Sequence, residues 1–432
     1  RIQHFKLVTD NSFKIGKNRL TLLLGHQRNQ RQEFGNVLVP EEQSLYFDLG
    51  TFNYNLQFLF AEKKNTKITI GVNGMQQTNK NKGTEQLIPE YFLFDIGGFV
   101  YLQKKFEKLT FSGGIRFDIR SLDSEELLDG VDVKFAAFKK NFSNISGSIG
   151  VAYQASNTVT WKFNLARGFR APAIPELASN GAHEGTSRFE YGEQNLKSET
   201  SLQADAGIEI ASEHVSFTTN VFYNAMYHFI YYRKLQAVAG GDSLITDGPD
   251  TFFAFQFNQH NASLYGAEFN LDIHPHPLDW LHVENTFSWV RGLFNTAQDG
   301  NKNLPFIPSA RLINEVKVDL LKKGKTIRNL FLKMELDNNF AQKNPFTGYN
   351  TETATSGYSL LNAGIGGEIR GKDKKIAFFF IGVNNISDVA YQNHLGRLKY
   401  APENKVSGRM GVFGMGRNFS VKLNVPLDFS VK

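Results

Sequence analysis

Two clusters of residues in long polar segments of this chain have the types and spacing of ligand-binding sites. In the first, His183 and Glu184 are adjacent, and Arg188 and Tyr191 follow shortly after them. An imidazole beside a carboxylate is a candidate zinc pair, and a lone imidazole can ligate haem iron. The same residues could instead serve loop packing and hydrogen bonding. The sequence leaves both interpretations open.

The second cluster holds His394, Arg397 and Lys399 between two tyrosines, Tyr391 and Tyr400. Cationic side chains so close together could bind an anionic metal chelate, because charge-assisted hydrogen bonds to anions are strong. A solvated loop face is an equal alternative for them. A tyrosine from either cluster could flank a haem ring.

Other histidines have simpler interpretations. His274 and His276 flank Pro275 in a short segment, and their spacing could place two imidazoles on one metal. A structural role in that turn is the simpler explanation. His26 and His282 lie inside expected strands, where a polar-facing imidazole needs no metal.

No pattern in the sequence indicates an enzyme. A phosphate-binding glycine loop, a nucleophile elbow and suitably spaced paired carboxylates are all missing from the sequence, so we expect no catalytic residue and no intrinsic cofactor. The chain has no cysteine, which excludes disulfides and thiolate metal sites. Its net charge of +6 is mild and dispersed, with lysines gathered at expected turns, and does not indicate a nucleic-acid partner.

The elements that must position both clusters are strands in which polar and apolar residues alternate. For example, Val159, Trp161, Phe163 and Leu165 are separated by polar or small residues. Successive strand side chains point to opposite faces, so one face is apolar and the other polar. No run reaches the eighteen or so apolar residues of a membrane helix. A soluble sandwich would need a second sheet to cover the apolar face, whereas lipid covers it in a transmembrane antiparallel β-barrel.

We expect about seventeen strands, from residues 2–14 to residues 413–425, joined alternately by short turns and long loops. In a bacterial outer-membrane barrel the short turns are periplasmic and the long loops extracellular, and the number of strands is even. An odd number therefore predicts strands upstream of residue 1. Five more strands would give a total of about 22, the number of strands in transporters whose lumen is plugged. Residues 1–432 are accordingly expected to be the C-terminal part of such a barrel.

The segment that holds the first cluster resembles part of a known protein family. Phe169, Arg170, Ala171 and Pro172 resemble the FRAP-type box of TonB-dependent outer-membrane receptors, and the range 193–196 (Glu-Gln-Asn-Leu) resembles their NPNL-type box without its proline. Further segments that resemble the family are residues 264–269, 304–308, 383–388 and 416–419. Physically, prolines end the strand here, so Phe169 and Arg170 are interpreted as a barrel-rim anchor rather than a substrate contact.

The resemblance implies a multi-pass protein of the bacterial outer membrane that takes up a metal or metal chelate, such as an iron complex (siderophore) or zinc. Uptake would be driven by the TonB energy-transducing complex through an N-terminal plug domain, which is absent from this chain. The partners expected are outer-membrane lipid, the TonB complex, the small-molecule or metal-chelate ligand, and protein partners at the extracellular loops. A haem receptor, a barrel scaffold in a surface assembly complex and a passive porin remain alternatives.

The residues expected to bind substrate are His183, Glu184, Arg188, Tyr191, His394 and Arg397, with His183 and Glu184 as candidate metal ligands. If both loops contribute to capture, His183 and Glu184 should point to the extracellular mouth of the lumen, near His394 and Arg397. The transported species would be zinc, an iron chelate or haem.

Overall fold

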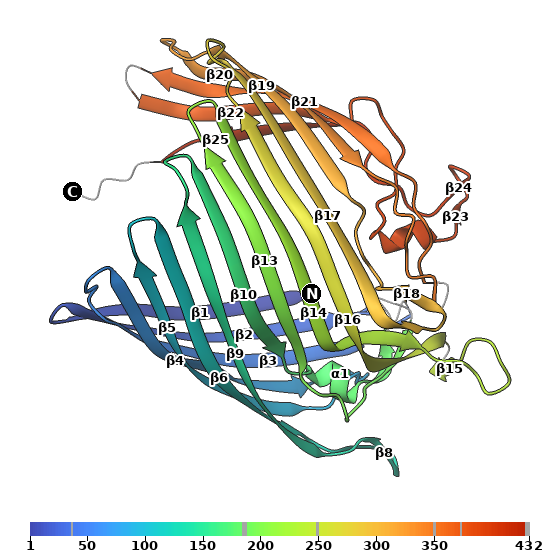
Figure 1. Ribbon diagram of the computed structural model, residues 1–432. Helices are drawn as coiled ribbons and strands as arrows, with labels where there is room; N and C mark the ends of the chain where they lie inside the picture. The colour runs from blue at the N-terminus through green and yellow to red at the C-terminus, as the bar shows by residue number, and fades with distance from the viewer. Residues whose placement is uncertain (36–37, 184–187, 248–249, 349–350, 372–373, 428–432) are drawn as a thin grey trace. The chain divides into compact units, whose positions relative to one another are not determined.

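The computed structural model describes residues 1–35, 38–183, 188–247, 250–348, 351–371 and 374–427, and these form mostly β-strands (Figure 1). A short helix, α1 (Ile174–Ala178), and a 3-10 turn, η3 (Arg397–Tyr400), lie in loops. No helix in the described ranges has the length and apolar character needed to cross a membrane.

Seventeen long strands occur among the described residues, and each coincides with a strand expected from the alternation. They are β1 (Ile2–Ile15), β2 (Asn18–Glu33), β3 (Leu45–Leu59), β4 (Thr66–Asn81), β5 (Tyr91–Lys105), β6 (Leu109–Ser124), β9 (Phe138–Gln154), β10 (Val159–Arg170), β13 (Glu199–Ala211), β14 (Val215–Lys234), β16 (Asp250–Ile273), β17 (Leu281–Gln298), β19 (Arg311–Leu321), β20 (Ile327–Asn339), β21 (Tyr358–Gly371), β22 (Lys374–Asn384) and β25 (Asn418–Asn424).

Short strands that the alternation did not predict lie within the long loops. They are β7 (Leu127–Asp129), β8 (Asp132–Phe135), β11 (Asn180–His183), β12 (Arg188–Tyr191), β15 (Leu244–Asp247), β18 (Asn301–Asn303), β23 (Glu403–Asn404) and β24 (Arg409–Met410). Segments of two to four residues are too short for a period of two to be recognised in the sequence.

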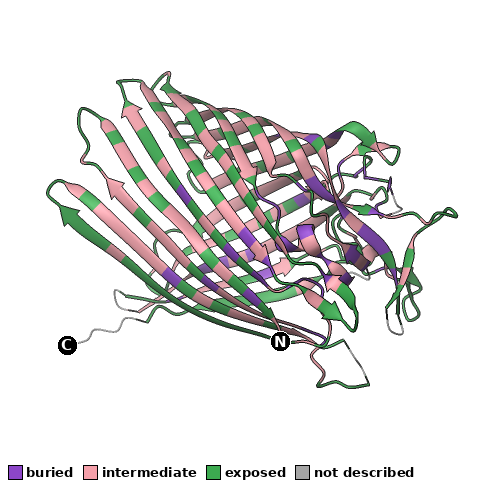
Figure 2. Ribbon diagram, turned by 90° about the horizontal axis from the view of Figure 1, so that it is seen from below, coloured by how far each residue is buried: buried purple, intermediate pink, exposed green. Residues whose placement is uncertain are grey.

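Burial alternates along many of the long strands as the sequence predicts, although β1 and β25 are exposed almost throughout. In β5, Tyr91 and Leu93 are buried, whereas Phe92 and Phe94 are exposed. The same alternation of exposed and less exposed residues is visible along many strands in Figure 2. A strand such as β5 therefore has one face with buried side chains at its end and one that leaves large apolar side chains uncovered.

Tight turns fix the register of the hairpins. In β1 and β2, the antiparallel pairing runs without a shift from Ile2 opposite Arg31 to Ile15 opposite Asn18. Gly16 begins the two-residue turn with a φ of +59°, which glycine adopts without steric cost.

The strand pairing is antiparallel almost throughout. In the described part of the chain, twenty-one strands belong to one sheet, while β7–β8 and β23–β24 form separate two-stranded sheets. One exception is the parallel pairing of β12 with β16, where Arg188 lies opposite Phe253. This pairing attaches the loop hairpin β11–β12 to a long strand.

The chain divides into two compact units. The first comprises residues 1–152, 164–204 and 224–262, and the second comprises residues 153–163, 205–223 and 263–432. The cluster around His183 belongs to the first unit and the cluster around His394 to the second.

The first unit has a hydrophobic core where loops pack onto strand ends. Leu177 of α1 is 1% exposed, and Leu122 of β6 is 0% exposed. The other buried members of this core are Leu45, Leu87, Ile88, Tyr91, Leu93, Ile174, Leu196, Ile230 and Phe257. The loop that connects β10 to β13 is thus anchored to the same face of β5 that carries Tyr91 and Leu93.

Candidate functional site

A cavity of about 730 Å³ lies in the second unit, at the ends of strands that lead into long loops. Its polar walls come from the first residues of β19 and β21, the end of β20 and the loop between β22 and β25. The lining residues that matter chemically are Arg311, Asp337, Tyr358, Tyr391, His394 and Lys399. Its size is within the usual range for small-molecule sites.

A bidentate ion pair forms one wall of this cavity. Arg311 Nε and Nη2 donate to the two carboxylate oxygens of Asp337 at 2.8 and 2.7 Å. The carboxylate side chain is 10% exposed and the guanidinium side chain 47% exposed, so the cation keeps an accessible face. Such a face can contact an anionic ligand without loss of the pair.

Aromatic rings form a second wall. The rings of Tyr358 and Tyr391 lie 4.6 Å apart, and Asn393 donates a hydrogen bond of 3.4 Å to the Tyr358 hydroxyl. The two rings are tilted by 33° to each other, and such phenols provide apolar surface together with polar hydroxyls. The cavity therefore combines cations with aromatic surface.

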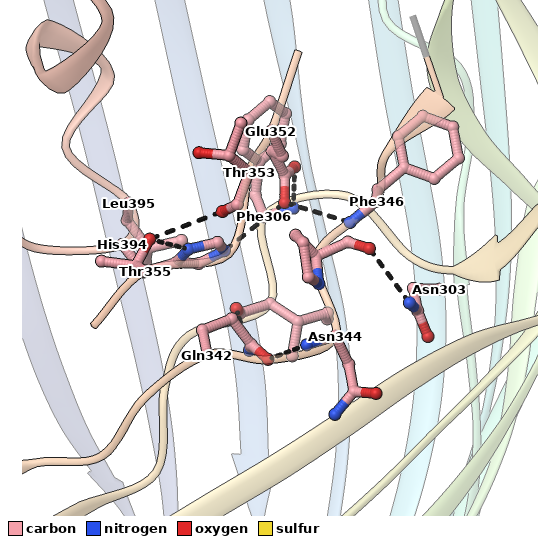
Figure 3. Close-up of polar contacts among 12 residues, drawn as sticks. Asn303, Phe306, Gln342, Asn344, Phe346, Glu352, Thr353, Thr355, His394 and Leu395 are labelled. Carbon is pink, nitrogen blue, oxygen red and sulfur yellow. Dashed lines mark hydrogen bonds and ion pairs between the residues drawn. The ribbon is translucent and has the colours of Figure 1, made fainter. Parts of the chain in front are cut away.

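His394 lies at this cavity but is held by neighbouring loop residues (Figure 3). Its Nδ1 is 2.9 Å from Thr355 Oγ1, and its Nε2 is 3.4 Å from Glu352 Oε2. The side chain is 2% exposed. With both ring nitrogens beside protein partners, His394 fixes the loops in this arrangement.

Glu352 connects three loop segments through the same contacts. Its carboxylate accepts hydrogen bonds from the backbone N–H of Phe306 at 2.6 Å and of Phe346 at 3.4 Å (Figure 3). Gln342 adds bonds from its side-chain amide to the carbonyls of Ile307 and Pro308, at 2.9 and 3.1 Å. These bonds hold one side of the cavity in place.

Arg397 and Lys399, two of the cations of the last long loop, have different surroundings. The guanidinium of Arg397 lies 4.4 Å from the centre of the Phe306 ring, and Arg397 does not line the cavity. Lys399 does line it and donates a 2.7 Å hydrogen bond to Thr355 Oγ1. Of this pair, Lys399 is therefore the one placed to meet a ligand in the cavity.

In the first unit, His183 contacts a carboxylate that is not its sequence neighbour. Its Nδ1 lies 3.3 Å from Glu190 Oε1 across the β11–β12 hairpin. This hydrogen bond raises the pKa of His183 above its ordinary value, against the opposing effect of burial. Glu184, the expected partner in a zinc pair, lies outside the described residues. No group of three His, Asp or Glu side chains suited to a metal ion occurs in the described ranges.

Arg188 and Tyr191 belong to the same hairpin. The guanidinium of Arg188, a residue that is 8% exposed, lies 4.6 Å from the Phe255 ring and 5.2 Å from the Tyr232 ring. Tyr191 packs beside Phe189 with ring centres 5.0 Å apart. In this arrangement Arg188 attaches the hairpin to the neighbouring strands, in agreement with the loop-packing interpretation.

The FRAP-type box forms a clamp on the loop that follows it. Arg170 Nη1 donates to both carboxylate oxygens of Glu176 at 2.8 and 2.7 Å, and its Nη2 lies 3.2 Å from Glu199 Oε2. Glu176 also accepts a 2.7 Å bond from the N–H of Ala173 at the start of α1. These contacts support the interpretation of Arg170 as an anchor. Phe169 and Arg170 also line a second cavity, of about 510 Å³.

Sequence reasoning missed Arg311, Asp337 and Tyr358 as site residues. Their polar position on alternating strands was visible, but their proximity depends on the register in which β19, β20 and β21 pair. The predicted proximity of His183 to His394 concerns two different units and stays a prediction.

Comparison with known proteins identifies one family and many similar structures. Residues 7–386 match the family described as "TonB dependent receptor-like, beta-barrel". The copper transporter OprC is similar with a TM-score of 0.75 at 15% identity, covering 98% of this chain and 65% of OprC. The FrpB iron transporter from Neisseria meningitidis (F5-1 variant) has a TM-score of 0.70 at 12% identity, covering 98% of this chain and 63% of FrpB.

A third similar structure is a double mutant of the Serratia marcescens hemophore receptor HasR in complex with its hemophore HasA and heme. Its TM-score is 0.61 at 11% identity, with 98% of this chain and 71% of that chain covered. No curated protein matches the sequence. This chain spans less than two thirds of the length of OprC and of FrpB. Sequence identities of 11–15% show a shared fold alone.

Proposed function

Because this chain belongs to the TonB-dependent receptor-like β-barrel family, we propose that it forms the barrel of an outer-membrane receptor that takes up a metal chelate. The proposal includes a plug supplied by residues outside these 432 and coupling of that plug to the TonB complex. The activity proposed is energy-driven transport, not catalysis. The family assignment supports both the location and this mechanism.

The two faces of the strands support an orientation in the membrane. Leu332, Met334 and Leu336 of β20 are at least 40% exposed, while Lys333 forms a 2.7 Å ion pair with Glu315 on the opposite face. A charged side chain facing lipid costs about 2–4 kcal/mol near the bilayer centre, so the apolar face is assigned to lipid and the charged face to the lumen. The proposal places the long loops outside the cell and the short turns in the periplasm, as is usual in bacterial outer-membrane barrels.

We infer the class of ligand from the cavity of about 730 Å³ at the strand ends that lead into long loops. Arg311, Lys399, Tyr358 and Tyr391 are among the residues that line it. Cations beside neighbouring aromatic rings suit a bulky anionic chelate, since they combine charge-assisted hydrogen bonds with apolar contact.

A chelate is favoured over a bare zinc ion. His183 is engaged with Glu190, His394 with Glu352 and Thr355, and the described residues provide no preformed metal-binding triad. A metal that arrives already coordinated needs no ligands from the protein. Haem is the second candidate, because the neighbouring rings of Tyr358 and Tyr391, tilted by 33°, offer aromatic surface to a macrocycle.

A growth experiment with cells that lack the receptor separates these classes. We expect the full-length receptor to restore growth when the sole iron source is a ferric chelate that is too large for porins. Restoration by haem alone would favour the second candidate. If the receptor instead supports growth only under zinc limitation, or under none of the three conditions, the chelate proposal is wrong.

A further inference from the structure

Three short turns of the first unit lie next to one another at the same strand ends. They are residues 14–19 between β1 and β2, residues 61–67 between β3 and β4, and residues 104–108 between β5 and β6. The side chain of Asn18 accepts a 2.8 Å hydrogen bond from the N–H of Ala61, and the N–H of Lys105 donates to the carbonyl of Asn65 at 3.0 Å. The three turns thus form one continuous surface, which we call the lysine-rich turns.

The lysine-rich turns carry a strong excess of positive charge. Their carboxylates are Glu62 and Glu107, and Glu62 lies 3.8 Å from Lys67. Their cations are Lys14, Lys17, Arg19, Lys63, Lys64, Lys67, Lys104, Lys105 and Lys108. Basic clusters beside a membrane attract anionic lipid headgroups.

Aromatic side chains place these turns at the edge of the apolar strand face. Lys104 shares a face with Leu102 and Val100, because alternate residues of a strand point the same way, and both apolar residues are exposed. The Lys104 ammonium lies 5.6 Å from the centre of the Phe106 ring, which is itself exposed. Rows of aromatic residues mark the membrane interface in β-barrels. Lys104 therefore stands where the apolar face ends and the turn begins.

An apolar groove of about 520 Å³ lies on the same face of the same strands. One row of residues that are paired across neighbouring strands lines it: Leu20, Phe58, Ile70, Val100 and Ile115. Gly98, which also lines the groove, has no side chain to fill the space beside this row. A Cβ atom added there would find its nearest neighbour, the carbonyl oxygen of Gly71, at 3.8 Å. The groove therefore exists because position 98 is a glycine.

We propose that the lysine-rich turns and this groove together bind an anionic phospholipid, with its phosphate against the lysines and an acyl chain in the groove. Lys104 follows Gly98 by six positions, which is about 20 Å along a strand. Barrel strands are tilted by roughly 40°, so this corresponds to about 15 Å of depth, or half of a hydrocarbon core about 30 Å thick. One lipid in the leaflet beside the short turns can therefore reach both features.

The combination of the two features favours a lipid over a free anion. A soluble phosphate would contact the lysines and leave the groove empty, whereas a phospholipid uses both surfaces. Binding of this kind rests on the proposed assignment of the apolar strand face to lipid, but not on uptake. The cavity lined by Arg311 and Lys399 belongs to the second unit, whereas the lysine-rich turns and the groove belong to the first.

The experiment is native mass spectrometry of the purified full-length receptor in a non-ionic detergent. The receptor is titrated with phosphatidylglycerol and, separately, with zwitterionic phosphatidylcholine that has the same acyl chains. We expect phosphatidylglycerol to bind at least about tenfold more tightly, because several cations act on its phosphate together. The combined change Lys63→Gln, Lys64→Gln and Lys104→Gln should abolish this preference and leave the binding of phosphatidylcholine unchanged.

The matched control removes the same charge from a short turn of the second unit, by Lys322→Gln, Lys323→Gln and Lys325→Gln. This control should keep the preference for phosphatidylglycerol. Equal binding of both lipids to the parent would overturn the proposal. So would an equal loss in the two triple variants, because it would show a general effect of net charge.

A second variant tests the groove independently of charge. Gly98→Leu fills the groove and should weaken the binding of both lipids, whereas Gly98→Ala adds one methyl group and should bind as the parent does. Circular dichroism of both variants checks the fold. Unchanged lipid binding in folded Gly98→Leu, or complete displacement of phosphatidylglycerol by excess glycerol 3-phosphate, would exclude the groove. Iron uptake should be normal in the lysine variant, and its absence in the parent would contradict the proposed function without affecting lipid binding.

Discussion

The carboxylate of Glu352 and the imidazole of His394 face each other at 3.4 Å, with their side chains only 3% and 2% exposed. The two residues come from different long loops, so this contact joins them at the wall of the larger cavity. Since Glu352 also accepts backbone bonds from Phe306 and Phe346, one side chain holds three loop segments.

Glu352→Ala should release these loops while the strands stay folded. The variant leaves the buried N–H of Phe346 and the partly buried N–H of Phe306 without acceptors, and an unpaired buried group costs about 1–3 kcal/mol. Hydrogen exchange followed by mass spectrometry should show faster exchange in peptides that contain Phe306 and Phe346. Glu403→Ala, a change at an exposed position of the last loop, is the control. Unchanged exchange in the Glu352 variant would show that the loops are held by other contacts.

The His183–Glu190 contact should make the β11–β12 hairpin sensitive to pH. Because the folded-state pKa of His183 is raised above the ordinary value of about 6.5, its contribution to stability is fully present below about pH 6.5 and is lost as the pH rises through the folded-state pKa. Hydrogen exchange of residues 180–183 and 188–191 should therefore quicken over that interval. Glu190→Gln should lower the pKa of His183 and flatten the dependence, whereas an equally steep dependence in this variant would exclude Glu190 as the cause.

Arg170→Lys should open the loop between β10 and β13 without removing a positive charge. Lysine cannot reproduce the paired donors that Arg170 directs at Glu176 and the additional bond to Glu199. Limited proteolysis of intact cells should cut residues 171–198 faster in this variant. Arg19→Lys, at an exposed position of β2, serves as the control, and equal cleavage of both variants would remove Arg170 from the role of a clamp.

Lys399→Ala should weaken the binding of an anionic ferric chelate by about tenfold or more, since a hydrogen bond to a charged group is worth roughly 1.5–3 kcal/mol. Lys399→Arg should retain most of the affinity. Lys405→Ala removes an equal charge from an exposed position of the same loop and should have little effect. If both alanine variants bind equally well, Lys399 is not a ligand contact. Binding is measured by titration of cells that carry the receptor.

The long strands could be predicted from the sequence because two different environments act on alternate residues of each strand. Trp161, Phe163 and Leu165 are all at least 42% exposed, on the face that the sequence assigns to lipid. The short strands β11 and β12 lie in a loop without such alternation, and their pairing was not predicted. The expectation of seventeen long strands is confirmed, whereas the loop hairpins had no signal that could reveal them.

The site was predicted less completely, and the reason lies in strand register. His183 pairs with Glu190 because the hairpin places Arg188 opposite His183, a relationship that adjacency to Glu184 does not reveal. Likewise, Arg311 reaches Asp337 because β19 and β20 pair with Ile313 opposite Asp337. Arg311 and Asp337 are 26 positions apart in the sequence, and their spacing alone does not reveal that strand pairing brings them into contact.

The most direct test of the proposed function is the uptake of radioactive iron, supplied as an anionic ferric chelate, by cells with and without this receptor. Each strain is measured with and without a functional TonB protein. Our account predicts accumulation only when both the receptor and TonB are present, and reduced accumulation in the Lys399→Ala variant. Uptake that requires the receptor but persists undiminished without TonB would contradict the account, because it would show a passive pore.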